Sequence, residues 1–149
     1  NKNKNIELLV RSHPRYPKSQ ISNILNKHEK LDWKFCDYDI IIKNTNINIV
    51  VSMWSTMILD ALVLKIPVIE FFRCSNNRSW FKDQYGNDVT GYEKNKIVIS
   101  VKNEIELEQS INEIINENFD KVNNTFNNFE ILFDITQPSI ESTINEIVK

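Results

Sequence analysis

The chain has 149 residues, 41% hydrophobic and 26% charged, which is enough for one domain with a single buried core. Eighteen basic and twenty acidic side chains leave a net charge of -2 without any basic stripe, so the composition disfavours a nucleic-acid-binding protein. Only two glycines occur, Gly86 and Gly91, in one polar stretch. Glycine-rich phosphate loops need several glycines at fixed spacing, which excludes a Walker A loop and a dinucleotide-binding fingerprint.

The spacing of cysteine and histidine excludes further kinds of site. Cys36 and Cys74 are too few and too far apart for a disulfide framework or a Cys-x-x-Cys metal site, and His13 and His28 complete no metal-ligand pattern. We therefore expect neither a metal nor a cofactor. Free thiols favour the cytoplasm. No apolar run reaches the roughly 18 residues of a membrane span, so we expect no transmembrane segment.

The first 52 residues predict an alternation of strands and one helix. The expected elements are a strand over Ile6–Arg11, a helix over Lys18–Lys30, a strand over Trp33–Cys36 and a strand over Ile47–Ser52. The run Asp39–Asn46 fits either a strand or one turn of buried helix. The continuous β-branched run that ends at Ser52 is typical of a buried parallel strand.

The rest of the chain continues this alternation. The expected elements are a buried helix over Thr56–Leu64, a strand over Pro67–Phe72, a long loop over 73–96, a strand over Lys96–Val101 and helices over Glu104–Asn118, Phe119–Phe133 and Ser139–Val148. This order predicts an α/β fold, an open parallel sheet with helices on both faces. We expect a single domain over 1–149, cut from a longer protein, with 1–5 as a linker stub and 134–149 as a C-terminal helix.

Polar residues stand at or just after the carboxyl ends of three of the predicted strands. Open parallel sheets bind their ligands at this edge. The first segment holds His13 and Arg15. A histidine can transfer a proton near neutral pH or pair with phosphate, and an arginine offers a planar fork to an anion. The ordinary alternative is a surface loop in which His13 caps a helix or packs on Pro14.

The second segment carries the hydroxyl groups of Ser52, Ser55 and Thr56 between a strand and a helix. Hydroxyls at a helix start commonly cap backbone N–H groups, and the same geometry can bind an anion without glycine. Asp60 shares a helix face with Thr56. Because a carboxylate on a buried helix needs a partner, ribose hydroxyls or a nearby Lys or Arg would satisfy Asp60.

The third polar position is Glu70, near the carboxyl end of a strand that otherwise reads Val-Ile-Glu-Phe-Phe. Its side chain points toward the same crevice as the other two segments in an open parallel sheet. The structural alternative is a salt bridge to Arg73 or Arg78. Aromatic residues around these segments are more typical of packing than of base stacking.

The order of these motifs carries more information than any one of them. LLVRSHPR (residues 8–15) and IVVSMWSTMILDALVLKIPVIEFF (residues 49–72) resemble the C-terminal half of GT-B-fold glycosyltransferases, particularly bacterial surface-polysaccharide enzymes such as sialyltransferases and capsule Kdo transferases. EIELEQSINEII (residues 104–115) more loosely resembles the helix that closes such domains. The resemblance implies a Rossmann-like domain that binds a nucleotide-activated sugar.

The resemblance also implies roles for individual residues. His13 would contact the donor phosphate and assist departure of the nucleotide, and Ser55 and Thr56 would hold that phosphate. The remaining residues of the expected donor site are Arg15, Ser52, Asp60 and Glu70.

Two positions depart from the family pattern. Asp60 stands where related enzymes often have a Glu that binds ribose, and it is one methylene shorter. Lys65 stands where a Gly commonly ends the helix. The general base of inverting members belongs to the N-terminal GT-B domain, which this chain lacks, so we expect the chain alone to turn over poorly.

The expected function is therefore a metal-independent glycosyltransferase domain for surface-polysaccharide synthesis. Its expected partners are a CMP- or UDP-linked sugar donor, a glycan or glycolipid acceptor and the missing N-terminal domain, in the cytoplasm or at the inner-membrane surface. Similar motifs occur in CDP-glycerol glycerophosphotransferases and non-hydrolysing UDP-GlcNAc 2-epimerases. The alternatives are therefore one of these enzymes or a non-catalytic module that binds a nucleotide sugar.

Overall fold

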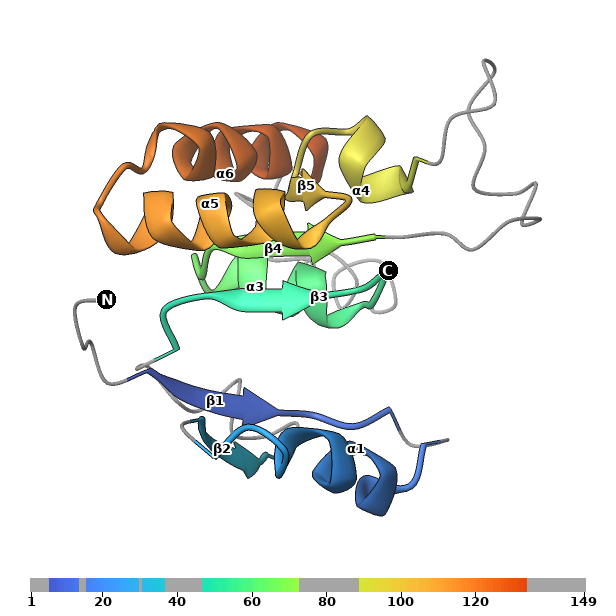
Figure 1. Ribbon diagram of the computed structural model, residues 1–149. Coiled ribbons are helices and arrows are strands. Elements are labelled where there is room, and N and C mark those ends of the chain that lie inside the picture. Colours follow the sequence, from blue (N-terminus) through green and yellow to red (C-terminus); the bar gives the residue numbers. More distant parts are fainter. Residues whose placement is uncertain (1–5, 14–15, 30, 37–46, 73–88, 134–149) are drawn as a thin grey trace, which may run out of the picture. The chain divides into compact units, whose positions relative to one another are not determined.

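The computed structural model describes residues 6–13, 16–29, 31–36, 47–72 and 89–133, and these form an α/β fold (Figure 1). The chain divides into two units, Asn1–Asn46 and Ile47–Lys149, and each holds a small parallel sheet. The α/β class and the parallel strands expected from the sequence are confirmed. A single domain over 1–149 stays a prediction, and the expected linker over 1–5 and helix over 134–149 lie outside the described residues.

The first unit is a strand–helix–strand segment. Strand β1 (Glu7–Val10) pairs in parallel with β2 (Asp32–Phe35), and α1 (Lys18–Leu25) connects them. Helix α1 is shorter than the expected Lys18–Lys30, because the chain leaves it through turns in which Lys27 and His28 bond to carbonyls three residues earlier. Its apolar Ile24 is 61% exposed, and no residue of α1 is buried. The ambiguous run Asp39–Asn46 lies outside the described residues.

The second unit contains a three-stranded parallel sheet in the order β3–β4–β5. In chain order its elements are β3 (Val50–Ser52), α3 (Met57–Val63), β4 (Val68–Phe71), α4 (Gly91–Lys94), β5 (Ile99–Val101), α5 (Glu104–Ile115) and α6 (Asp120–Phe133). Both strand pairs are parallel, and β4 lies in the centre. These strands and the helices α3, α5 and α6 lie within the segments predicted for them, and each is shorter than its predicted range.

The sheet of the second unit is covered on both faces. Successive strand residues point to opposite faces, so Val68 belongs to one apolar cluster and Ile69 to another. Helix α3 packs against the Val68 face, whereas α5 packs against the Ile69 face, and α6 contributes to both clusters (Figure 1). Within this unit, the expected helices on both faces are confirmed.

Two expectations need correction. Helix α3 is buried on one side only: Ile58 and Leu62 are inaccessible, but Val63 is 58% exposed, because only one side of the helix meets the sheet. The long loop expected over 73–96 is wrong at its end, where α4 forms. The hydroxyl of Thr90 accepts the Glu93 N–H at 3.0 Å, and Thr-x-x-Glu is a capping signal that the sequence displays. Residues 73–88 lie outside the described residues.

Three helices end in left-handed residues that are not glycine. Lys65, Lys96 and Glu117 have φ values of 56°, 55° and 63° and directly follow the C-caps of α3, α4 and α5. Each donates its N–H to the carbonyl three residues back, and each following residue donates five back, which is the Schellman pattern. At these three helix ends, residues with side chains occupy the left-handed position that glycine usually takes. Each such residue raises the conformational energy of the backbone by about 1 kcal/mol.

Candidate functional site

The polar residues of the three-stranded sheet lie in one row near the carboxyl ends of its strands. In the parallel register Ser52 pairs with Glu70, and Glu70 pairs with Ser100. Paired residues share a face, so all three side chains lie on the face that α3 covers. Because ligands of open parallel sheets bind beyond the carboxyl ends of the strands, this row marks the candidate site. The structure thus brings together the two predicted residues Ser52 and Glu70.

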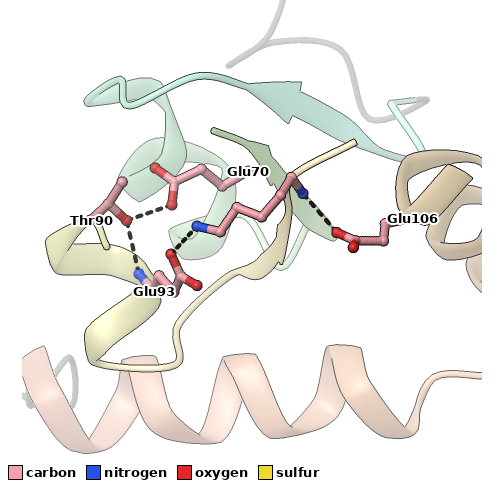
Figure 2. A network of polar contacts seen from close by, with 5 residues as sticks. Glu70, Thr90, Glu93 and Glu106 are labelled. Carbon is pink, nitrogen blue, oxygen red and sulfur yellow. Dashed lines mark hydrogen bonds and ion pairs between the residues drawn. The ribbon is translucent and has the colours of Figure 1, made fainter. Parts of the chain in front are cut away.

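Glu70 is fully buried, and one of its two carboxyl oxygens, Oε1, has no hydrogen-bond partner among the described residues. Its exposed fraction is 0%, and the hydroxyl of Thr90 donates to Oε2 across 2.5 Å (Figure 2). Among the described residues, neither Oε1 of Glu70 nor Oγ of Ser100 has a hydrogen-bond partner. Buried polar atoms without partners are uncommon. The expected alternative partners of Glu70, Arg73 and Arg78, lie outside the described residues.

The surroundings of Glu70 favour its protonated form. Burial raises the pKa of this carboxyl group above its ordinary value, and the charge of Glu93 raises it further. The bond from Thr90, the positive charge of Lys102 and a backbone hydrogen bond from Trp54 lower the pKa, without offsetting the effect of burial. Glu70 therefore keeps its proton to a higher pH than an exposed glutamate.

Charged side chains join the sheet to the neighbouring helices around Glu70. Lys102, directly after β5, forms an ion pair with Glu93 of α4, and its backbone N–H donates to Glu106 of α5 at 2.7 Å (Figure 2). Burial, followed by the charge of Glu70, raises the pKa of Tyr92 in α4. The carboxyl end of the sheet, α4 and the start of α5 thus share one polar network.

The turn between β3 and α3 presents the predicted hydroxyl groups. Trp54 has a φ of 41°, the left-handed region that glycine usually occupies. The Ser55 hydroxyl accepts the N–H of Met57 at 3.3 Å, so Ser55 has the expected capping role. Thr56 is the N-cap residue of α3, but its side chain makes no capping bond and is exposed. Asp60 is half-buried in the first turn of α3.

The remaining predicted residues belong to the first unit. His13 is exposed, its carbonyl accepts the N–H of Tyr16 at 2.9 Å, and its ring lies edge-on to the Tyr16 ring at 6.2 Å between centroids. Arg15 and Pro14 lie outside the described residues. The sequence-based prediction that His13 and Thr56 flank one phosphate therefore stays a prediction.

Sequence reasoning missed Thr90, Ser100 and Lys102. The capping pattern of Thr90 could have identified the start of a helix. Ser100 could have been found by aligning the polar positions of the predicted parallel strands, because Ser52, Glu70 and Ser100 each stand at or near a strand end. Nothing in the sequence around Lys102 indicates that it reaches Glu93.

A separate groove of about 430 Å³ runs along the outer edge of β5, between α5 and α6. Most of the residues that line it are polar or charged, and the ion pair between Lys121 and Glu113 lies at this groove. Apart from Ser100, the groove contains no residue of the polar row, and none of the residues predicted from the sequence lines it. The groove thus shares Ser100 with the polar row and Glu106 with the polar network around Lys102.

The part of the chain that the structure describes contains no cluster of three or more potential metal ligands. Within the same residues, no helix combines the length and apolar character needed to cross a membrane. Comparisons with protein-family models, with curated proteins and with solved structures found no match to this chain.

Proposed function

We propose that this chain is the nucleotide-sugar-binding half of a metal-independent glycosyltransferase of the GT-B type, active in surface-glycan assembly. The observation that carries the proposal is the hydroxyl-bearing β3–α3 turn beyond the carboxyl end of a parallel sheet. Thr56 supports it most directly, because its exposed hydroxyl makes no capping bond and is available to a ligand. The motif order described above adds the resemblance to this enzyme class.

In the proposed site, Ser55 and Thr56 hold the donor phosphate and Asp60 binds ribose hydroxyls. His13 contacts the same phosphate, and in its protonated form neutralises the charge that develops as the nucleotide leaves. Arg15 adds a second positive charge. Hydroxyl and cationic groups would then supply the charge stabilisation that a metal ion supplies in other transferases.

The proposed partners follow from this chemistry. The donor is a CMP- or UDP-linked sugar, and the acceptor is a glycan or glycolipid presented by the N-terminal domain of the complete enzyme. The proposed location is the cytoplasm or the inner-membrane surface, where such acceptors are extended.

Thermal unfolding with added nucleotides tests the proposal. The chain would be heated with CMP, CDP, UDP, GDP or their sugar conjugates, beside the variants His13→Ala and Thr56→Ala. Ser19→Ala, an exposed hydroxyl in α1, is the matched control. A ligand at 100 times its Kd should stabilise the chain by about 2.7 kcal/mol.

We expect a shift for one nucleotide that both site variants lose and the control keeps. A shift that survives in both variants would contradict the proposed site. No shift with any nucleotide, in this chain and in the complete enzyme, would contradict the proposed function.

A further inference from the structure

We propose that Glu70 is a positioning residue, whose buried carboxyl group holds the β3–α3 turn and the start of α4 in the arrangement that binds the donor, without touching the donor. The part of this inference that concerns the donor rests on the proposed function. The coupling of the two segments through Glu70 does not, and it can be measured without any nucleotide.

The contacts of Glu70 connect both segments. Its oxygen Oε2 accepts a hydrogen bond from Thr90, which also caps α4 by accepting the N–H of Glu93. In the strand register Glu70 lies beside Ser52, two residues before Trp54, and the backbone of Trp54 donates to the same carboxyl group. One side chain from the central strand therefore links two loops that are 36 residues apart in the chain.

Complete burial separates Glu70 from any ligand at the surface. Its exposed fraction is 0%, whereas Thr56, two residues after Trp54, is exposed. A ligand at the turn would meet Thr56 and not the carboxyl group below it. In this proposal Glu70 supports the turn from within the fold, whereas the sequence-based prediction places Glu70 among the residues that bind the donor.

The backbone of the turn explains why it needs such support. Trp54 adopts a left-handed conformation that a β-carbon disfavours, directly before the two hydroxyl residues. A hydrogen bond from its N–H to a buried carboxyl group stabilises that conformation. Loss of the bond should let the turn relax, which would displace Ser55 and Thr56.

The groups that face Glu70 come from three elements and determine how it responds to pH. They are Trp54 from the β3–α3 turn, Thr90, Tyr92 and Glu93 from the start of α4, and Lys102 after β5. A change in the charge of Glu70 should therefore be felt at Trp54, because the Trp54 N–H donates to the group that titrates.

The test follows the backbone amide of Trp54 by NMR through a pH titration of the whole chain. We expect its resonance to titrate with Glu70 in the wild type and to lose this step in Glu70→Gln. Thr90→Val removes a bond that lowers the pKa of Glu70, so the midpoint should move to higher pH. Thr90→Ser keeps the hydroxyl and should restore the wild-type midpoint. A Trp54 resonance that ignores both substitutions would overturn the proposal.

The second readout is the affinity for the nucleotide that stabilises the wild type. We expect Thr90→Val and Glu70→Met to weaken binding about tenfold, the loss of one hydrogen bond, and Thr90→Ser to keep it within about twofold. Unchanged affinity in Thr90→Val and Glu70→Met, or a direct contact between nucleotide and Glu70 in a complex, would overturn the proposal. If neither this chain nor the complete enzyme binds a nucleotide, the proposed function fails, and the Trp54 titration alone decides the coupling.

Discussion

The two faces of the three-stranded sheet differ in polarity at the carboxyl ends of the strands. On the α5 face, Ile69, Phe71, Ile99 and Val101 form a continuous apolar layer. On the α3 face, the apolar layer gives way to the row Ser52, Glu70 and Ser100 at the carboxyl end. Burying polar groups costs free energy that the α5 face avoids. The polar row therefore does not contribute to stability through apolar burial, as the α5 face does.

The largest effect should come from the apolar face. Ile69→Ala removes most of an inaccessible side chain from the central strand and should lower the free energy of unfolding by about 2–5 kcal/mol. Urea denaturation measures this change. Val51→Ala, on the same face but 47% exposed at the sheet edge, should cost much less. Equal losses at both positions would contradict the apolar layer described for this face.

A smaller effect is expected at the polar row through Thr90. Thr90→Val leaves α4 without its cap and a buried carboxylate oxygen without its donor, which should lower the free energy of unfolding by about 1–3 kcal/mol. Thr90→Ser keeps both bonds and should stay close to the wild type. Thermal and urea unfolding of Thr90→Val and Thr90→Ser separates the effect of losing the hydroxyl group from the effect of changing the side-chain volume. Should the serine variant unfold as easily as the valine variant, the hydroxyl has no role.

The third effect is a pH dependence that belongs to Glu70. Because its pKa is raised in the folded chain, folded protein binds the proton more tightly than unfolded protein between the ordinary value of 4.5 and the raised value. The wild type should therefore lose stability relative to Glu70→Gln as pH rises through this window, and the difference should level off above it. Each tenfold difference in proton affinity is worth about 1.4 kcal/mol. Parallel stability profiles for the two proteins would contradict the raised pKa.

The smallest effects lie outside both faces, at the helix ends. Lys96→Gly and Glu117→Gly place glycine at left-handed positions, and each should raise the free energy of unfolding by about 0.5–1 kcal/mol. Ile105→Gly, at an exposed position of α5, should instead lower the free energy of unfolding by a similar amount. Differential scanning calorimetry resolves these differences. Destabilisation by both helix-end glycines would rule out the left-handed backbone at these positions.

The sequence predicted most of the second unit because its signals are local. The β-branched strands, the helical spacing in 104–115 and 120–133, and the hydroxyl-rich turn before α3 all depend on residues close in the chain. The contact between Glu70 and Thr90 joins residues that are 20 positions apart in the chain, and no local pattern determines it. The left-handed conformation of Trp54 could not be predicted either, because it is mainly a glycine that indicates a positive φ, and Trp54 has a β-carbon.

In the first unit, the sequence predicted the strands and the helix but not their burial. The pattern of Ile21, Ile24 and Leu25 indicates an apolar helix face, yet no residue of α1 is buried. Among the described residues of this unit, only Cys36 is buried. Helical spacing identifies which side chains share a face, but it does not determine whether that face is buried.

An NMR titration of the isotopically labelled chain with the stabilising nucleotide tests the central claim most directly. We predict that the largest shifts in the backbone amide resonances occur at Trp54, Ser55 and Thr56, with smaller shifts at Thr90 transmitted through Glu70. Shifts confined to the groove between β5, α5 and α6, or saturation that leaves the β3–α3 turn unchanged, would contradict a binding site at the carboxyl end of this sheet.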